Sequence, residues 1–398
     1  MPVSTSVVVV AHRSHEWLPV CLASVADCDD LVVVDNGSPA SEVSEVARRA
    51  GARLVRLPAN VGFPAGVNAG VGAARGEIVA LLNDDAMAEP GWLPASSAAL
   101  EDPGIAAVAP KLVFALPHAE IRFDDEPRRI GSDIRWFGRP VRSATVGGED
   151  VLTRLVGPGI HRFEDGELDG QRGPWRWTNG RDSFYLALQP GWQADDLLVN
   201  GEPAPVRGEV TLVNNAGSYL STEGHVGDYG YLSPDDGTFD EPADRFGACG
   251  AAMVVRRDTL RRLGVFAGHF FAYYEDVDWC WRAQLAGLRV RFDPAGVVRH
   301  VGGVTSGGPL AQRVRNLTAR NRLLCLARNA PLGVLRWQAS VVLRQPPVPG
   351  LRPSLATTVP RALLERRRLG RLWARTPGEV WQRWAGVDEV WGPVPTQR

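Results

Sequence analysis

Acidic side chains cluster at two places in the chain, and the first cluster has the composition of a cation site. Asn83, Asp84 and Asp85 follow directly on the apolar run 78–82, which has the length of a buried strand. Ligands of open α/β sheets bind at the carboxyl ends of the strands. Because adjacent carboxylates repel each other unless a cation meets them, the pattern favours a divalent metal with oxygen ligands. An acidic loop that caps the next helix is the alternative interpretation.

The second cluster combines acids with aromatic side chains. Residues 270–282 contain six aromatic residues and three acids, among them Glu275 and Asp276. Asp276 falls in the first turn of an expected helix, where the helix dipole stabilises a carboxylate. Helix capping would explain it, but three acids among six aromatics suit a hydrophobic core poorly, so a functional site is favoured. A lone His such as His300 is usually structural, and it would be a metal ligand if it meets Asp85 in space.

Alternating strands and helices are expected to position these groups. The predicted strands are 6–11, 31–34, 53–57 and 77–82, and the predicted helices are 18–25, 41–50 and 67–75. This order is typical of βαβ units and a mostly parallel sheet. Asp35 and Asn36 end the second strand, so we expect them at the same rim as the first acidic cluster. The glycine-rich turn 62–66 would add backbone N–H groups there, as an anion site or only as a tight turn.

The regular alternation stops near residue 122. Residues 122–213 are rich in Gly, Pro, Asp and Trp and contain short alternating segments, which predicts an inserted β-rich module. Asn179-Gly180 and Asn200-Gly201 have the sequences of hairpin turns. The module also contains four tryptophans, which we expect to fill a small core in preference to stacking on a sugar. They are Trp136, Trp175, Trp177 and Trp192.

The end of the chain is helical and basic, although the net charge of all 398 residues is only −1. Residues 301–378 contain 14 Arg and one acid, Glu365. The predicted helix 361–375 interleaves Leu and Arg, a pattern that suits an anionic membrane surface or a solvated basic face. No nucleic-acid-binding motif is present, so nucleic acid is not an expected partner.

Cysteine usage and hydropathy indicate the compartment. The five cysteines are scattered and form no Cys-x-x-Cys, which disfavours a disulfide framework or a zinc site. No signal sequence or membrane-spanning run is recognisable. We therefore expect a cytoplasmic protein, with peripheral contact to the inner face of the plasma membrane through its basic helices.

The motifs taken together resemble those of family 2 glycosyltransferases with the GT-A fold, especially bacterial rhamnosyltransferase-like members. The resemblance covers about residues 4–120 and 214–330. The segments that carry it are 7–13, 32–38, 60–63, 66–70, 81–85, 247–253, 271–278, His300 and 320–322. Each motif alone is weak, whereas their order and spacing are jointly specific. Asn83 stands where the family more commonly has Asp, and residues 122–213 depart from the family pattern.

The resemblance implies a role for each matching residue. Asp276 is similar to the catalytic base of the family, while Asp85 and His300 are similar to its ligands for Mn²⁺ or Mg²⁺. The implied nucleotide-sugar contacts are Ala11, His12, Arg13, Asp35, Gly62, Asn68, Asn83 and Asp84. The candidates on the acceptor side are Cys249, Gly250, Glu275 and Trp279.

The expected architecture is an α/β GT-A fold, Rossmann-like, with a mostly parallel sheet, a β-rich insertion and a basic helical tail. Residues 1–121 would bind the nucleotide-sugar, 122–213 form the insertion, 214–330 bear the acceptor and catalytic groups, and 331–398 form the Arg-rich tail. The expected function is metal-dependent, inverting transfer of a sugar, with rhamnose favoured, from a nucleotide-diphosphate sugar to a glycan or polyprenyl-linked acceptor in cell wall polysaccharide biosynthesis.

Two other functions remain open at this point. A non-catalytic glycan-binding or scaffold protein could use the β insertion, but it would not need Asp85, Asp276 and His300 together. A sugar-nucleotide nucleotidyltransferase of similar fold would need a Gly-rich phosphate loop with Lys or Arg near the N-terminus. Residues 10–16 form no such loop.

Overall fold

The computed structural model describes residues 4–13, 16–39, 41–302, 309–344 and 351–386. These residues form two compact units. Unit 1 comprises the described residues within 1–113, 214–229 and 237–390, and unit 2 those within 114–213 and 230–236. No helix in the described part of the chain is both long and apolar enough to cross a membrane.

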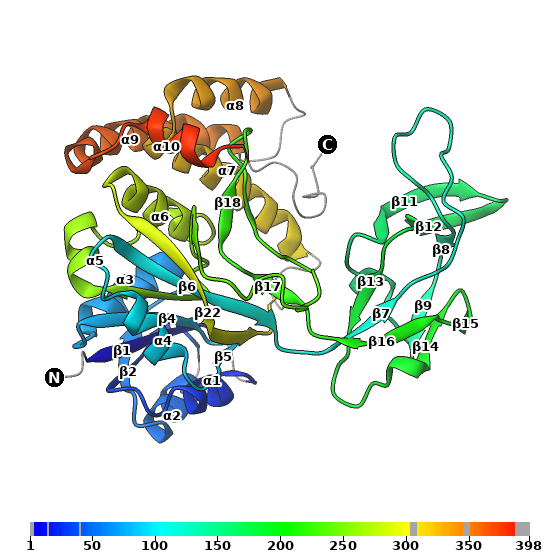
Figure 1. The fold of residues 1–398 in the computed structure, drawn as a ribbon, viewed down its shortest axis with the longest axis horizontal. Helices are drawn as coiled ribbons and strands as arrows, with labels where there is room; N and C mark the ends of the chain where they lie inside the picture. Colours follow the sequence, from blue (N-terminus) through cyan, green and yellow to red (C-terminus); the bar gives the residue numbers. More distant parts are fainter. Residues whose placement is uncertain (1–3, 14–15, 40, 303–308, 345–350, 387–398) are drawn as a thin grey trace. The chain divides into compact units, whose positions relative to one another are not determined.

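Unit 1 is built on a mixed, mostly parallel sheet of ten strands, as the sequence predicts (Figure 1). The path through it is β20-β22-β6-β21-β4-β1-β2-β3, with β5 paired to β22 and β17 to β6. The strands are β1 (Thr5–Ala11), β2 (Asp30–Asn36), β3 (Arg53–Leu57), β4 (Ile78–Asn83), β5 (Ala86–Ala88), β6 (Ile105–Phe114), β17 (Val213–Asn215), β20 (Ala243–Arg245), β21 (Ala252–Arg256) and β22 (Arg289–His300). β1 lies parallel to both β2 and β4, whereas β21 inserts antiparallel between β4 and β6.

Helices cover both faces of this sheet, which explains the unbroken valine run of β1. Val7 and Val9 lie in the same core cluster as apolar residues of α1 (Leu18–Ser24) and α2 (Glu42–Arg49). Val8 and Val10 contact α3 (Phe63–Ala73) instead. Since successive side chains of a strand point to opposite faces, an alternating pattern would have left one face without apolar cover.

The remaining helices complete unit 1. They are α4 (Trp92–Ala99), α5 (Arg257–Leu263), α6 (Glu275–Leu285), α7 (Pro309–Asn329), α8 (Leu332–Arg344), α9 (Leu351–Leu369) and α10 (Pro377–Trp384). Figure 1 shows α6 to α10 on the side of unit 1 away from α1 and α2. Apolar residues of α6, α7, α8, α9 and α10 share one core, which includes Trp281, Leu324 and Val380.

Two local predictions were wrong. The turn expected at 62–66 is shorter, because α3 already begins at Phe63 with Pro64 in its first turn, where proline is tolerated. The apolar run 288–292 predicts a strand that Asp293-Pro294 ends, but the strand β22 continues to His300. Pro294 has no N–H to donate, and β22 changes partner across it, from β20 before the proline to β5 after it.

Unit 2 consists of short antiparallel strands in three small sheets, ordered β10-β9-β14-β15, β11-β12-β8 and β13-β7-β16. The strands are β7 (His118–Ile121), β8 (Pro140–Val141), β9 (Ala144–Val146), β10 (Glu149–Asp150), β11 (Ile160–Leu168), β12 (Gln171–Thr178), β13 (Phe184–Ala187), β14 (Leu197–Val199), β15 (Glu202–Pro203) and β16 (Val206–Val210). This β-rich architecture agrees with the fold expected for the insertion.

The turn and core predictions for unit 2 were only partly right. Asn200-Gly201 joins the paired strands β14 and β15 with positive φ at both residues, as a two-residue hairpin turn requires. Asn179-Gly180 does not make a hairpin, because the strands β12 and β13 on either side of it pair with other strands. Trp175 and Trp177 are buried beside Phe137 in a small core, as expected.

A buried ion-pair network ties α6 to α7. The Asp278 carboxylate is completely buried and accepts hydrogen bonds from Arg282 Nε at 3.1 Å, Arg328 Nε at 2.6 Å and Asn329 Nδ2 at 2.8 Å. Although burial opposes ionisation, the two guanidiniums lower the pKa of Asp278. The network therefore fixes the start of α6, where Asp276 lies.

Removing the acid of this network should destabilise unit 1 strongly. Asp278→Ala would leave Arg282 buried without its counter-charge and Arg328 with Glu365 alone, and such a loss typically costs about 3–5 kcal/mol. Asp102→Ala is the matched control, since it breaks an exposed pair with Arg289, worth about 1 kcal/mol or less, and one exposed hydrogen bond from the Gly104 N–H. Urea unfolding followed by circular dichroism would compare the two. A midpoint shift in Asp278→Ala no larger than that of the control would contradict this account.

Candidate active site

The carboxyl ends of three parallel strands bring the predicted donor-side residues to one rim of unit 1. In the register of the sheet, Ala11 of β1 lies beside Asp35 of β2, and Val10 lies beside Asn83 of β4. The backbone N–H of His12 hydrogen-bonds to Asp84. This rim is where open α/β sheets bind their ligands.

Asp35 is completely buried, but only one of its two carboxylate oxygens has a hydrogen-bond partner. Its Oδ1 accepts the Ser38 N–H at 2.9 Å, whereas its Oδ2 is buried without a hydrogen-bond partner. Arg56 Nε lies 3.5 Å from that Oδ2 on a half-exposed side chain. Buried acceptors are normally hydrogen-bonded, so a donor from a ligand is the expected complement.

The turn before α3 contacts the loop before α6. Gly62 has φ +87°, and a Cβ at this position would lie 2.4 Å from the Phe271 carbonyl oxygen. Only glycine permits both this backbone conformation and this close approach. The Phe63 N–H donates to the same carbonyl at 2.8 Å. The N-terminus of α3 and the loop that leads to Asp276 are therefore held together.

Asp85 and His300 meet, as the sequence analysis expected. Asp85 lies in the turn between β4 and β5, and pairing of β22 with β5 brings His300 beside it. His300 Nε2 is 3.2 Å from Asp85 Oδ1 and 3.4 Å from Asn83 Nδ2. The other ring nitrogen, Nδ1, is 3.2 Å from Asn214 Oδ1, a contact that orients the imidazole. Asn214 was not identified from the sequence.

The two adjacent aspartates have opposite pKa shifts. Burial, followed by the charge of Asp85, raises the pKa of Asp84 to about 7. Burial opposes ionisation of Asp85 as well, but the hydrogen bond and charge of His300 outweigh it and lower the pKa of that carboxyl. Asp85 is therefore the ionised member of the pair and the better metal ligand.

The residues around Asp85 fit a divalent cation that is also bound by its substrate. Asp85 and His300 offer one carboxylate and one imidazole at contact distance, and Asn83 Oδ1 is buried without a partner beside them. No group of three or more His, Cys, Asp or Glu side chains suited to a metal occurs among the described residues. Mg²⁺-type sites commonly combine one or two carboxylates with substrate phosphates, and this donor set matches that arrangement.

Asp276 lies at the start of α6 and is partly buried beside other acids. Its Oδ2 accepts the Gly250 N–H at 2.7 Å, and its Oδ1 accepts the Val277 N–H at 2.7 Å. A Cβ on Gly250 would lie 3.3 Å from Asp276 Oδ2 and 3.4 Å from the Phe63 ring, so the glycine leaves room for the carboxylate. Burial raises the pKa of Asp276 despite these hydrogen bonds.

Further acids surround Asp276. Glu275 is buried, its Oε2 has no partner, and burial together with the charge of Asp276 raises its pKa to about 8. Asp228 of β19 (Val226–Asp228) is solvent-exposed but held by Asn215 Nδ2 at 2.6 Å, and desolvation and the Asp276 charge raise its pKa. Nothing in the sequence distinguished Asp228 from other loop acids. Burial and the same acids raise the pKa of the Cys249 thiol.

The sheet brings the Asp85–His300 pair and Asp276 to the same rim. β21 pairs antiparallel with β4, and the Asn83 N–H donates to the Ala251 carbonyl at 2.8 Å. Gly250, whose N–H donates to Asp276, directly precedes Ala251 in the chain. Two acidic clusters almost 200 residues apart in sequence therefore share one rim.

Asn321 holds the loop before Asp276 in an unfavourable conformation. Phe271, Tyr273 and Tyr274 all have φ near +70°, which costs of the order of 1–3 kcal/mol each for a residue with a side chain. The completely buried Asn321 Nδ2 lies 2.7–2.9 Å from the carbonyl oxygens of Phe270, Ala272 and Tyr273. Arg320 Nη2 adds hydrogen bonds to the carbonyls of residues 269 and 270.

Other candidates from the sequence are engaged elsewhere. Trp279 is completely buried and its indole N–H donates to the Gly264 carbonyl at 2.9 Å, so it is a core residue and offers no surface to an acceptor. The Asn68 amide clamps both backbone groups of Phe266, at 2.8 and 3.0 Å, which gives it a structural role in the fold. Arg13 lies just beyond β1 with an exposed side chain.

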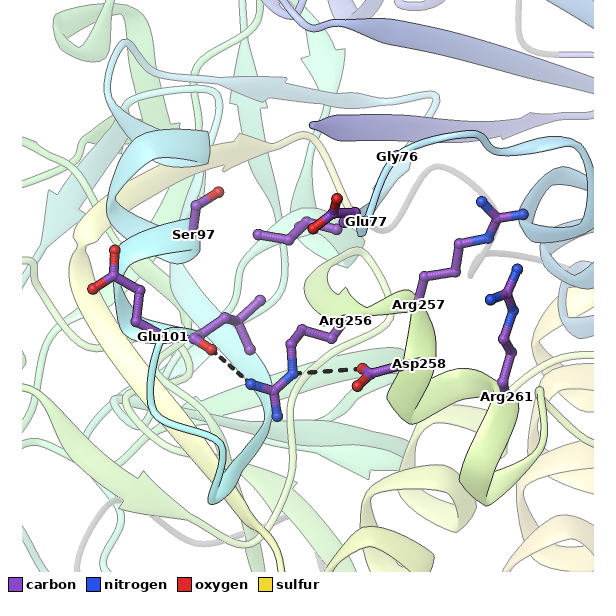
Figure 2. Close-up of a pocket in the computed structure, with 10 residues that line it drawn as sticks. Gly76, Glu77, Ser97, Glu101, Arg256, Arg257, Asp258 and Arg261 are labelled. Atoms are coloured by element: carbon purple, nitrogen blue, oxygen red, sulfur yellow. Dashed lines mark hydrogen bonds and ion pairs between the residues drawn. The ribbon is translucent and has the colours of Figure 1, made fainter. Parts of the chain in front are cut away.

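A separate cavity of about 330 Å³ lies at the opposite end of β4 (Figure 2). It is lined by Glu77 and Ile78 at the start of β4 and by Arg256 at the end of the antiparallel strand β21. Arg256 is already bonded to the carbonyls of residues 100 and 103. None of the predicted site residues lines this cavity, and it takes no part in the site.

Loss of the Asn321 amide should loosen the loop before Asp276. Asn321→Leu keeps the side-chain volume but removes every donor, so amide exchange in residues 270–276 should accelerate at least about tenfold, because each hydrogen bond contributes about 1 kcal/mol. Asn68→Leu removes a comparable clamp at Phe266 and is the matched control. Hydrogen-exchange mass spectrometry would locate both effects. Unchanged exchange at 270–276 in Asn321→Leu would refute the role.

Comparison with known proteins gives one family match and several structural similarities. The family model described as Glycosyl transferase family 2 matches residues 6–128, and no curated protein matches the chain at a significant level. The structure is similar to GalNAc-T7, crystallised with UDP, GalNAc and Mn²⁺, at a TM-score of 0.53 and 10% identity over 96% of this chain and 56% of that chain.

Two further solved structures are similar at lower TM-scores. The mannosyltransferase PcManGT from Pyrobaculum calidifontis, in complex with GDP-Man and Mn²⁺, has a TM-score of 0.41 and 14% identity over 93% of this chain and 74% of that chain. Glucosyl-3-phosphoglycerate synthase from Mycobacterium tuberculosis has a TM-score of 0.26 and 23% identity over 28% of this chain and 44% of that chain.

The similarity to GalNAc-T7 concerns the fold, and this chain spans about half the length of that protein. The family match covers residues 6–128, which include Asp35, Asn83 and Asp85. The match therefore identifies residues 6–128 as a glycosyl transferase family 2 domain, an enzyme domain, and the similarity to GalNAc-T7 supports its GT-A fold.

Proposed function

We propose that the protein transfers a glycosyl group from a nucleotide-diphosphate sugar to an acceptor hydroxyl, with inversion at the anomeric carbon. The observation that carries this proposal is the convergence of Asp276 with the pair Asp85–His300 at one rim of the sheet. A base would assist the attacking hydroxyl and a cation would stabilise the departing diphosphate in a single displacement at an anomeric carbon.

The donor would lie across the ends of β1, β2 and β4. The free buried oxygen of Asp35 is placed to accept a hydrogen bond from the base or ribose of a nucleotide. Ala11 and His12 of the first strand, Gly62 at the start of α3, and Asn83 and Asp84 surround the same rim. Backbone N–H groups at the N-terminus of α3 favour an anion such as a diphosphate.

Asp85 and His300 would hold Mn²⁺ or Mg²⁺ together with the diphosphate. The bound ion would stabilise the negative charge that develops on the departing diphosphate. Asn83 Oδ1, which has no partner in the protein, is available to a ligand of that ion or to the substrate. The Asn214 contact to Nδ1 keeps His300 Nε2 directed at Asp85.

Asp276 would act as the general base. Its carboxylate accepts the proton of the acceptor O–H while that oxygen forms a bond to the anomeric carbon. The bond from the anomeric carbon to the diphosphate oxygen breaks with its electron pair, and the nucleoside diphosphate leaves. Gly250 and Val277 hold the carboxylate through backbone hydrogen bonds. Cys249, Gly250 and Glu275 would lie on the acceptor side of Asp276, and Asp228 is a further acid close enough to Asp276 to interact with its charge.

The substrates are proposed in more detail from the sequence motifs. Rhamnose is the first donor sugar to test, and a glycan or polyprenyl-linked glycan of cell wall polysaccharide synthesis is the proposed acceptor. A lipid-linked acceptor would bring the protein to the cytoplasmic face of a membrane.

We further propose that 1–121 binds the donor, 122–213 is an insertion, 214–330 bears the acceptor and catalytic groups, and 331–398 is an Arg-rich tail.

Nucleoside-diphosphate release with a panel of nucleotide-sugars, extracts of acceptor lipid and Mn²⁺ or Mg²⁺ tests the proposal. Asp276→Asn should lower turnover about 10²–10⁴-fold, because proton transfer to a positioned base contributes that much. Donor binding measured by calorimetry should survive in this variant, and a chelator should abolish it. The exposed Asp102→Asn is the control. Full turnover in Asp276→Asn would exclude it as base, and nucleotide binding that ignores both metal and chelator would favour the scaffold alternative.

The pH dependence of turnover should report the coupled acids. A base must be ionised to accept a proton, and burial raises the pKa of both Asp276 and Glu275, the latter to about 8. The protonated, inactive form therefore persists to higher pH than for an ordinary carboxyl, and kcat/KM should rise with pH in two steps that belong to the pair. Glu275→Gln should abolish the step near pH 8 and keep the lower one. Identical profiles for the variant and the parent would rule out this coupling.

A further inference from the structure

Helix α9 has an inner face that packs in the core and an outer face that is exposed. Its inner face packs into the core of unit 1 through Leu355, Val359, Ala362 and Leu363, and Arg366 on that side donates to the Ala330 carbonyl at 2.7 Å. The opposite face is exposed and continues into the 3₁₀ turn η4 (Gly370–Leu372). An amphipathic helix that only covers a core would carry polar residues on its outer face.

The outer face combines arginines with large apolar side chains. Its exposed residues recur at helical spacing, so they form one stripe along α9 and η4. Leu364 is 61% exposed and Leu372 is 40% exposed, which costs free energy in water. We call the exposed outer face of α9 and η4 the α9 stripe. It consists of Arg361, Leu364, Arg367, Arg368, Arg371 and Leu372.

Most of the positive charge on the α9 stripe is not neutralised within the protein. Glu365 is the single acid between residues 301 and 378, and it is already bound by Arg328 and Arg361. In the described part of the chain, no carboxylate forms an ion pair with Arg367, Arg368 or Arg371. Three like charges within five residues repel one another, and an external anionic partner would relieve this repulsion.

Helix α8 has an outer face of the same kind. Both α8 and α9 contact α7, and Figure 1 shows them on the same side of unit 1, opposite α1 and α2. Trp337 is 46% exposed and Leu343 is 65% exposed, while Leu335 and Val342 are buried on the inner side. Arg336 and Arg344 are exposed on the same outer arc as Leu343, and α8 contains no acid.

We propose that the α9 stripe, with the outer face of α8, docks the protein onto an anionic lipid bilayer. Guanidiniums would pair with lipid phosphates and acidic headgroups, while Leu364, Leu372, Trp337 and Leu343 enter the interface. A nucleic acid would satisfy the arginines but would leave the leucines in water, because its contacts go mainly to phosphates and base edges. The apolar members of the stripe therefore favour lipid. The inference extends the proposed function but does not require that the domain transfer sugars.

Sedimentation of the full-length protein with lipid vesicles tests the docking surface. The protein should bind vesicles of phosphatidylcholine mixed with phosphatidylglycerol, bind vesicles of phosphatidylcholine alone much more weakly, and lose binding as salt rises. The triple variant R367E/R368E/R371E should bind the mixed vesicles at least about 100-fold more weakly, since each arginine near an anionic surface contributes about fivefold. The double variant L364S/L372S should retain the salt dependence with reduced affinity.

The control variant R48E/R49E/R172E makes the same change in net charge at exposed arginines outside the surface. It should bind vesicles like the parent, and both triple variants should keep nucleotide binding and turnover of a water-soluble acceptor. Equal vesicle binding by the two triple variants would overturn the proposal, as would a parent protein that binds neither kind of vesicle. Tighter binding to duplex DNA or RNA than to mixed vesicles would overturn it in favour of a nucleic acid. Because vesicle binding is read without turnover, the docking surface and the glycosyl transfer can fail independently.

Discussion

The antiparallel pairing of β21 with β4 is the contact on which the site depends. β4 ends in Asn83, immediately before Asp84 and Asp85, and β21 begins just after Gly250, which donates to Asp276. The hydrogen bond from the Asn83 N–H to the Ala251 carbonyl joins these two ends. A parallel strand at this position would present its carboxyl end at the rim instead, and Gly250 would lie at the far end of the sheet. Strand direction therefore decides that Asp276 and the Asp85–His300 pair share one rim of the sheet.

A buried acid must either be stabilised as an ion or stay protonated to higher pH, and the structure contains both cases. Asp278 is stabilised as an ion by two arginines and an amide, so it serves to anchor α6 on α7. Glu275 and Asp276, in the same helical turn, receive no cation and have raised pKa values. The difference separates an acid that holds the fold from acids that stay protonated to higher pH than an ordinary carboxyl.

Strain at the loop before Asp276 is balanced by the C-terminal helices. Three residues in the left-handed region occur between Phe271 and Tyr274, and one amide on α7 hydrogen-bonds across the loop. α7 is in turn held by α9, whose Glu365 bonds to Arg328. The C-terminal helices thus support the site from within, while their outer faces carry unpaired arginines and exposed leucines. One set of helices can therefore serve both positioning and docking.

Local pattern in the sequence was sufficient for part of this protein. The valine run of β1, the acidic end of β4 and the helix with Asp276 in its first turn follow from hydrophobic run length and residue type. The order of motifs was enough to predict the GT-A fold. The Asn200-Gly201 hairpin was predicted because its conformation depends on two adjacent residues alone. Of the four tryptophans of the insertion, Trp175 and Trp177 lie in a small core, as their size predicted.

Other features were decided only by tertiary contacts. Trp279 has the same local surroundings in sequence as Asp276, yet packing against Gly264 and Phe266 buries it completely. Asn68 is occupied by Phe266, nearly 200 residues away. Asn214, Asp228 and Asn321 acquire their contacts from partners 86, 13 and 49 residues away. The continuation of β22 past Pro294 depends on which strands lie beside it. The sequence alone determined which residue types end each strand, whereas side-chain burial and hydrogen-bond partners depend on long-range packing, which no local pattern encodes.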